Sequence, residues 1–272
     1  MSVLLRVSGL RYAYPSGVVA LRGVDLEVSA GETVAVVGPN GSGKSSLLKA
    51  IAGLLKPFEG SIEVEGVDVG RTGVAEVSLR AGLVLQNPDV QLLYGTVAQE
   101  IGSGLRNRGM PDSKVAERVT EVASCLGLEH LLDAFPLALP KGERARVVVA
   151  AVMATRPRVI MLDEPTTGQD RGGSIGILSM ARDYAKDGKA VLFVTHNMEL
   201  VGRFADRIVL MKDGVIVADG PARSVLSRDR LLREASIIPP QAARIGMALW
   251  PMEPCPLDAD ELAGRVEDEL SR

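Results

Sequence analysis

Eight consecutive residues, from Gly38 to Ser45, carry the clearest chemistry in this sequence. They read Gly-Pro-Asn-Gly-Ser-Gly-Lys-Ser and match the pattern G-x-x-x-x-G-K-[ST] at every fixed position. In that pattern the glycines let backbone N–H groups turn toward phosphate oxygens. The lysine reaches the β- and γ-phosphates, and the last hydroxyl ligates Mg²⁺. We therefore expect a nucleoside triphosphate site whose contacts come from Gly38, Pro39, Asn40, Gly41, Ser42, Gly43, Lys44, Ser45 and Ser46.

The residues on either side of this loop have the character that the motif needs. The apolar run at 33–37 is typical of a buried strand, and residues 44–52 are typical of a helix. A helix that begins at the loop adds its partial positive charge to the phosphate site. A glycine-rich turn that binds nothing is a poor alternative, because the lysine, the hydroxyl and both flanks agree.

A second pair of chemical residues, Asp163 and Glu164, ends the apolar run at 159–162. A carboxylate at the end of a buried strand can hold Mg²⁺ through water, which is the role expected of Asp163. Glu164 can then polarise a water molecule for in-line attack on the γ-phosphate. A strand that ends in Asp-Glu by chance is the alternative, and the complete phosphate loop upstream argues against it.

The elements that must position these groups alternate between strands and helices. Strands are expected at 3–7, 24–28, 33–37, 61–64, 82–85, 159–162 and 190–194, and a hairpin at 208–218, while the region from about 96 to 155 is helical in character. Alternation of this kind predicts a largely parallel α/β sheet. From about residue 222 the chain is richer in proline and ends in a charged stretch, which favours an appendage with a partly disordered tail.

Composition narrows the function further. The chain has 272 residues, of which 46% are hydrophobic and only 3% aromatic, and its formal net charge is −3. That charge argues against a nucleic-acid partner. Cys125 and Cys255 stand in no metal or redox spacing, so we expect ordinary thiols in a reducing compartment. The N-terminus has no signal-peptide pattern, and no apolar run is long enough to span a membrane.

Taken together and in order, these motifs resemble the nucleotide-binding domain of an ATP-binding-cassette (ABC) ATPase over roughly residues 3–222. The resemblance implies an α/β P-loop NTPase fold with a RecA-like core, an antiparallel β subdomain and an α-helical subdomain at about 87–155. It places the ABC domain at 1–222 and a small C-terminal extension at 223–272. ATP and Mg²⁺ are the implied cofactors, and ATP hydrolysis is the implied reaction.

The same resemblance assigns roles to single residues. Gln86 would be the Q-loop glutamine that completes the Mg²⁺ shell, and His196 the switch histidine that donates to the γ-phosphate. Asp170 would be the D-loop aspartate. Tyr14 would stack on adenine, with Tyr12 as the less favoured choice. With Lys44 and Glu164, His196 completes the implied catalytic set; Ser45, Gln86 and Asp163 form the implied metal set.

The family signature, L-S-G-G-Q/E, corresponds to residues 139–143 and departs from the pattern at two positions. Pro140 replaces the usual serine and removes a hydroxyl and an N–H donor, and Lys141 replaces the first glycine. In this family the signature of one subunit closes over the phosphate loop of another, so Gly142 and Glu143 would contact a nucleotide held by a partner. We expect the site that receives this signature to be weakened, with Lys141 compensating in part.

Two stretches are similar to one branch of the family. Residues 85–100 resemble the Q-helix region of energy-coupling-factor (ECF) transporter ATPases, which import vitamins and transition-metal ions, and residues 237–249 resemble their C-terminal dimerisation segment. The implied partners are a second ABC ATPase subunit, in a homodimer or a heterodimer, a transmembrane coupling protein and a substrate-capture membrane protein. The implied location is the cytoplasmic face of the membrane. Polar residues Asp89, Gln91, Gln99 and Glu100 would dock the coupling protein.

Three alternatives stay open at this point. The chain could be the ATPase of a conventional importer, separated from the ECF branch only by those two stretches. It could be a degenerate ABC subunit that binds ATP as a regulatory clamp, as Pro140 suggests, although Glu164 and His196 argue against this. An ABC protein acting on ribosomes or DNA is less favoured, because the chain has neither a second cassette nor a long coiled-coil insertion.

Overall fold

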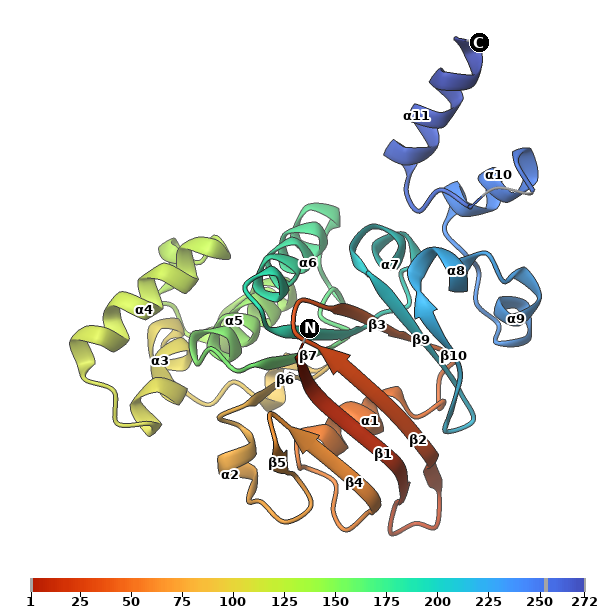
Figure 1. Ribbon diagram of the computed structural model, residues 1–272. Coiled ribbons are helices and arrows are strands. Elements are labelled where there is room, and N and C mark those ends of the chain that lie inside the picture. Colours follow the sequence, from red (N-terminus) through yellow and green to blue (C-terminus); the bar gives the residue numbers. More distant parts are fainter. Residues whose placement is uncertain (1, 252–253, 272) are drawn as a thin grey trace.

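The computed structural model describes residues 2–251 and 254–271, which form two β-sheets with surrounding helices (Figure 1). Within these residues the larger sheet has the strand order β10-β9-β3-β8-β7-β6 and the smaller sheet the order β2-β1-β4-β5. The strands are β1 (Val3–Ala13), β2 (Val19–Ser29), β3 (Thr33–Val37), β4 (Glu59–Val64), β5 (Val67–Asp68), β6 (Ala81–Val84), β7 (Val159–Asp163), β8 (Ala190–Val194), β9 (Arg207–Lys212) and β10 (Val215–Pro221).

The larger sheet is parallel except at one edge. Strands β3, β7 and β8 are buried at every position, which is the pattern of parallel strands covered on both faces. Only β10 runs antiparallel, because the turn at Asp213 and Gly214 returns the chain beside β9. Both turn residues have positive φ, 50° and 82°, as a two-residue hairpin turn requires. The α/β prediction is thus confirmed, hairpin included.

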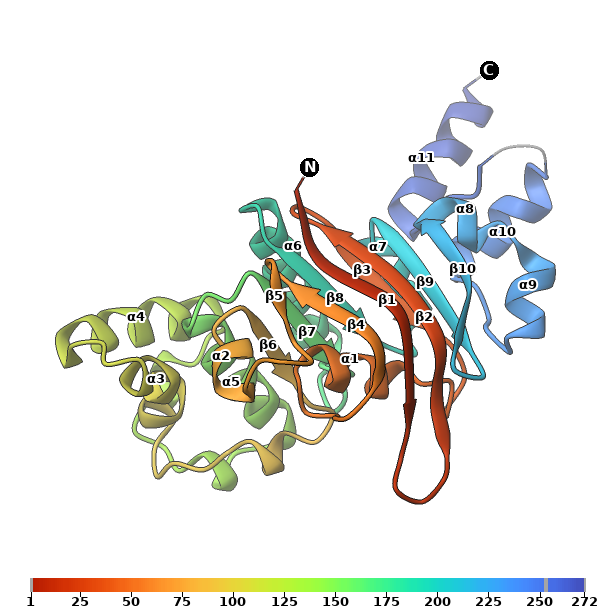
Figure 2. The ribbon, with the colours of Figure 1, turned by 60° about the horizontal axis from the view of Figure 1, so that its bottom comes forward.

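The smaller, antiparallel sheet packs over the helix that follows β3. This helix, α1 (Lys44–Ile51), contributes Leu47, Leu48 and Ile51 to a core that it shares with both sheets. Figure 2 shows the smaller sheet and α1 layered beside the larger sheet. The expected short strands at 3–7 and 24–28 are parts of two long strands, β1 and β2, of 11 residues each.

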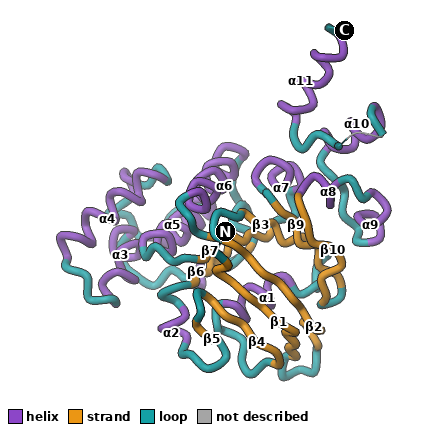
Figure 3. The backbone as a smooth tube through the Cα atoms, viewed as in Figure 1, coloured by secondary structure: helices purple, strands orange, loops and turns teal. Residues whose placement is uncertain are grey.

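The predicted helical region contains three main helices on one side of the molecule (Figure 3). Asp112 begins the second of them, directly after Pro111, and Gly127 follows its end. Arginine side chains close the end of the third helix: Arg118 donates to the carbonyls of Met153 and Ala154. The three helices are α3 (Val97–Asn107), α4 (Asp112–Cys125) and α5 (Lys141–Ala154). The short helix α2 (Val74–Val77) precedes them, and the 3₁₀ turns are η1 (Pro88–Val90), η2 (Glu129–Leu131) and η3 (Pro136–Ala138).

The C-terminal region is helical, and the expectation of a partly disordered tail is wrong for residues 258–271; Arg272 lies outside the described residues. Asp258 caps the last helix by accepting from the N–H of Glu261, and Arg223 holds the Glu261 carboxylate at 2.7 Å. Cap and ion pair together order a stretch whose composition alone favours disorder. Helices of this half are α6 (Arg171–Lys186), α7 (Met198–Phe204), α8 (Ala222–Leu226), α9 (Asp229–Glu234), α10 (Gln241–Leu249) and α11 (Ala259–Leu270).

The C-terminal extension shares the core of the larger sheet. Leu232, Ala235, Ala243 and Cys255 are buried in the same hydrophobic cluster as Phe204 and the strand β9. Helix α11 projects away from the body and buries none of its residues (Figure 1). Within the described residues, no helix has both the length and the apolar character that crossing a lipid bilayer demands.

Candidate nucleotide site

Four neighbouring strands of the larger sheet deliver the predicted site residues to one edge. In the order β3, β8, β7 and β6, their carboxyl ends lead into the phosphate loop, His196, Asp163 with Glu164, and Gln86. Because parallel strands end at a common edge, ligands of open α/β sheets bind there. The fold therefore gathers groups that are far apart in the sequence.

The phosphate loop is shaped by glycines that leave no room for a side chain. At Gly38, with φ of 150°, an added Cβ would collide with the carbonyl of Met211. At Gly43, with φ of 101°, it would meet the carbonyl of Ala20 at 2.6 Å. Lys44 is 7% exposed, and its Nζ donates to the carbonyls of Gly38 at 2.8 Å and Pro39 at 2.9 Å. The lysine thus lies along the loop that it is predicted to serve.

Oxygen ligands suitable for Mg²⁺ lie at the same edge. Asp163 is 3% exposed, and its Oδ1 has no hydrogen-bond partner among the described residues. Ser45 lies near enough to hydrogen-bond with this carboxyl group. A buried carboxylate oxygen without a partner is costly unless it serves a ligand. Carboxylate and hydroxyl oxygens are the donors that Mg²⁺ prefers, so these residues fit the metal that the motifs imply.

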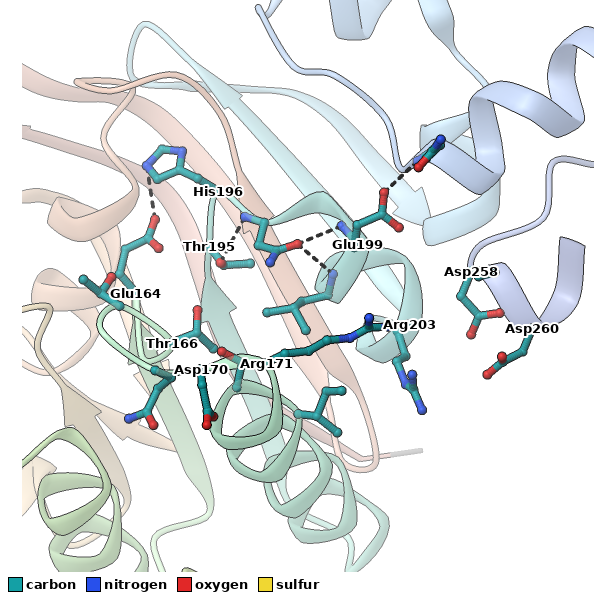
Figure 4. Close-up of a pocket in the computed structure, with 18 residues that line it drawn as sticks. Glu164, Thr166, Asp170, Arg171, Thr195, His196, Glu199, Arg203, Asp258 and Asp260 are labelled. Atoms are coloured by element: carbon teal, nitrogen blue, oxygen red, sulfur yellow. Dashed lines mark hydrogen bonds and ion pairs between the residues drawn. The ribbon is translucent and has the colours of Figure 1, made fainter. Parts of the chain in front are cut away.

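Glu164 and His196 face each other across the ends of β7 and β8. The Nε2 atom of His196 lies 3.1 Å from Oε1 of Glu164 (Figure 4). The Glu164 side chain is 10% exposed, whereas that of His196 is 57% exposed. Glu164 adopts a left-handed backbone with φ of 50°, while its N–H donates to the carbonyl of Val194. Such backbone strain in a non-glycine residue concentrates at functional sites.

Burial shifts the proton affinities at this edge. Burial, reinforced by the Asp163 carboxylate, raises the pKa of Glu164 to about 7. Burial also lowers the pKa of Lys44 and that of His196, where the Lys44 charge acts in the same direction. A carboxylate whose pKa lies near neutrality is suited to accept a proton from water at physiological pH.

The raised pKa of Glu164 predicts a pH-dependent stability effect for Glu164→Gln. The folded wild-type protein favours the protonated carboxyl, so ionisation costs stability as the pH rises from about 4.5 through about 7. Without nucleotide and metal, the glutamine variant should be more stable at pH 8 by up to about 3 kcal/mol. The gap should vanish below pH 4.5, which chemical denaturation at both pH values would measure. Equal stability at pH 8 would contradict the shift.

The structure distinguishes between the two candidate tyrosines. Tyr14 is half-buried, and its hydroxyl lies 2.9 Å from Oγ of Ser46, in the first turn of α1. Tyr12 is 9% exposed and packs edge-on against Tyr14, with ring centroids 5.1 Å apart. Tyr14 is therefore the tyrosine placed beside the phosphate loop, while Tyr12 supports it.

Gln86 is exposed just beyond β6, in a loop whose ends are joined by hydrogen bonds of a neighbouring side chain. The side chain of Gln91 accepts from the N–H of Leu85 at 2.7 Å and donates to the carbonyl of Leu83 at 3.0 Å. Gln91 thus closes the loop around Gln86. Sequence reasoning missed this role, because nothing local distinguishes a clamping glutamine from a solvated one.

Of the residues expected to dock a partner, Asp89, Gln91, Gln99 and Glu100, the structure contradicts that role only for Glu100, and for the others it stays a prediction. Glu100 is 4% exposed and accepts from the N–H groups of Leu93 and Tyr94. Gln91 is the clamp described above, and Asp89 forms an ion pair with Arg144 at 2.7 Å. Only Gln99 keeps an exposed side chain without such a partner among the described residues.

The substituted signature begins α5, with Pro140 as the residue before the first helical position. The proline ends an extended segment there, with ψ of 150°, so the helix is intact. Gln169 donates to the carbonyl of Gly142 at 2.6 Å, and Arg146 lies 3.8 Å from Glu143. None of the described interactions of Gly142 or Glu143 joins them to the phosphate loop of the same chain.

Comparison with known proteins decides the family. The family model for ABC transporters matches residues 21–167, more than half of the chain. This chain belongs to the ABC transporter family. The match includes the phosphate loop, the Asp163–Glu164 pair and the signature region, so ATP binding and ATP hydrolysis are properties of this ABC ATPase.

Two of the similar proteins are named as ATPases of the ECF or CbiO kind. The energy-coupling factor transporter ATP-binding protein EcfA of Methanothermobacter thermautotrophicus is 36% identical over 88% of this chain and 78% of the relative. CbiO1 of Clostridium perfringens, part of the ABC transporter complex CbiONQ, has a TM-score of 0.76 at 31% identity, covering 92% of this chain and 99% of that one. The ABC chain thus resembles ECF-type ATPases, as residues 85–100 predicted.

A further ABC structure is similar in fold and informative about chemistry. It is an ATP-binding cassette in a dimeric, post-hydrolysis state, bound to ADP and Pi. Its TM-score is 0.73 at 28% identity, with 80% of this chain and 99% of that chain covered.

Proposed function

We propose that this ABC ATPase is the ATP-hydrolysing subunit of an ECF-type importer that powers uptake of a vitamin or a transition-metal ion. The observation that carries the proposal is the buried Glu164 beside His196, at the sheet edge that also holds the phosphate loop. The likeness to EcfA and CbiO1 supports the ECF branch.

In the proposed mechanism, Lys44 binds the β- and γ-phosphates and Glu164 takes a proton from the attacking water. His196 donates a hydrogen bond to the γ-phosphate as charge develops there. Ser45, Gln86 and Asp163 would hold Mg²⁺, which when bound neutralises charge on the phosphates. Tyr14 stacks on adenine, and Gly142 with Glu143 contacts the nucleotide of a partner subunit.

We assign residues 1–222 to the ABC domain, with its helical subdomain at about 87–155, and residues 223–272 to an extension that contributes to dimerisation. The signature favours an unequal pair, because Pro140 cannot supply the hydroxyl of the usual serine. The same observation favours one second candidate, an ABC subunit that completes a non-hydrolysing site in its partner while its own phosphate loop supports turnover.

An apolar surface beside the Gln86 loop supports a membrane partner. Leu93 is 81% exposed, Val90 61% and Phe135 52%. Backbone hydrogen bonds from Val97 to Ala134 and from Ala98 to Leu132 join the two segments that carry these side chains. Exposed apolar clusters of this kind mark protein interfaces. We assign this surface, in place of the buried Glu100, to a cytoplasmic segment of the transmembrane coupling protein.

The test is co-purification of the tagged chain from native membranes in mild detergent. The proposal predicts recovery of a coupling membrane protein and a small capture protein, and loss of both from the variant Leu93→Asp. The control variant is Leu79→Asp, at a 43% exposed position that precedes β6, and it should still co-purify with both membrane proteins. Recovery of a conventional permease would move the chain to another branch, and recovery of no membrane protein would overturn the transport function.

A further inference from the structure

The switch histidine is fixed by the helix that follows it. His196 precedes Asn197, whose side chain caps α7 by accepting from the N–H groups of Glu199 and Leu200. The N–H of Asn197 in turn donates to Oγ1 of Thr195. Position and tilt of α7 therefore set the position of the imidazole.

The C-terminal extension sits directly on α7. The backbone N–H of Gln241, at the first position of α10, donates to Oε1 of Glu199 at 2.7 Å (Figure 4). One turn later, Gly202 has no room for a side chain, because an added Cβ would collide with the carbonyl of Leu257 and lie 3.2 Å from Pro240. Two points of contact thus join the extension to the helix behind His196.

The extension also forms the outer walls of the space around His196. A cavity of about 400 Å³ separates the phosphate loop and His196 from residues 236–238. A second cavity, of about 860 Å³, lies between Glu164 with His196 and a far wall that includes Gln241, Asp258 and Asp260. His196 lines both cavities, so apart from the contact with Glu164 its position depends on the backbone that leads into α7.

We propose that Glu199 is a positioning residue for ATP hydrolysis, through which the C-terminal extension holds α7 and thereby aims His196 at the γ-phosphate. This inference rests on the role proposed above for His196. The bond is charge-assisted, and it places a carboxylate at the positive end of α10, so it is stronger than a neutral contact. Movement of the extension, in this or a partner chain, would then change the hydrolytic rate.

The experiment removes each half of the contact separately, in the complex as purified. Gln241→Pro deletes the N–H together with the amide side chain, and Gln241→Ala, which removes the side chain but keeps the N–H, separates the two. Proline is tolerated at the first position of a helix, and Pro240 already has a compatible ψ of 147°. Glu199→Ala deletes the acceptor, while Glu199→Gln keeps one. Ala259→Pro is the matched control, since it introduces proline at the first position of α11, where no described hydrogen bond is lost.

We expect Gln241→Pro and Glu199→Ala to lower kcat about three- to tenfold, with KM for ATP unchanged, because misplacement well under 1 Å suffices for such a loss. The melting temperature should fall by no more than a few degrees, as for the loss of one hydrogen bond. The double variant should be no slower than either single variant, and Glu199→Gln should recover most of kcat. Ala259→Pro should hydrolyse ATP at the wild-type rate.

Two results would overturn the inference: wild-type kcat in Gln241→Pro, or losses that multiply in the double variant. A failure of the role proposed for His196 itself would be seen separately, because His196→Ala would then retain full ATPase activity. If His196→Ala loses activity while Gln241→Pro keeps it, the histidine role stands and the positioning role falls.

Discussion

Replacing Glu164 with glutamine should reduce ATP hydrolysis by at least about 100-fold, the usual contribution of a positioned general base. Glutamine keeps the volume of the side chain and cannot accept the proton of the attacking water. The effect should be large because Glu164 is 10% exposed and its pKa is raised to about 7, so near neutral pH its ionised fraction is a stronger base than an ordinary carboxylate. Phosphate release at saturating ATP measures it.

Binding of ATP should survive this substitution, since Glu164 carries negative charge into a site for an anion. The equilibrium dissociation constant, measured with a fluorescent ATP analogue, should stay equal or fall. Glu117→Gln, an exposed change on α4, serves as the control for removing one carboxylate. Turnover of the Glu164 variant within tenfold of the wild type would argue that another group activates the water.

The second large effect is expected for Lys44→Ala, which should weaken ATP binding by about 100-fold through loss of the phosphate-binding cation. Lys44 is 7% exposed and lies along the loop carbonyls of Gly38 and Pro39. In moving to the phosphates it exchanges two neutral acceptors for charged oxygens, which strengthens its hydrogen bonds. Isothermal titration calorimetry with ATP and Mg²⁺ measures the loss.

Two variants sharpen the interpretation of that loss. Lys44→Arg keeps the charge but not the shape, and it should restore only part of the affinity, because guanidinium does not fit the space of an ammonium point charge. Lys114→Ala removes an exposed charge on α4 and should leave affinity unchanged. Wild-type affinity in Lys44→Ala would mean that the glycine-rich loop binds phosphate through its backbone alone.

The sequence predicted those site residues that can be recognised from the local pattern and from the order of the strands along the chain. Lys44, Asp163, Glu164 and His196 each come after a buried apolar run, and parallel strands must end at one edge, so the convergence of these residues follows from the sequence pattern. The family resemblance also favoured Tyr14 over Tyr12, but the contact of Tyr14 with Ser46 depends on how the smaller sheet packs against α1, which the sequence does not indicate.

Other features depend on contacts that no local pattern indicates. A glutamate such as Glu100, on a polar helix face, is usually solvated. Here its carboxylate is buried and accepts hydrogen bonds from two N–H groups of the loop that precedes the helix. Residues 258–271 were expected to be partly disordered because charge dominates their composition. The Asp258 cap and the Arg223–Glu261 pair stabilise the helix instead. In both cases tertiary partners outweigh the average behaviour of the residue type.

The two-sided attachment of α5 has a thermodynamic consequence. Its first turn is joined to the Gln86 loop by Arg144 and Asp89, and to the segment after Glu164 by Gly142 and Gln169. If a membrane partner occupies the apolar surface beside that loop, its binding and that of ATP are linked through one helix. Linkage is reciprocal: whatever factor ATP adds to the affinity for the partner, the partner must add to the affinity for ATP. The membrane protein would then act as an effector of the ATPase as well as its load.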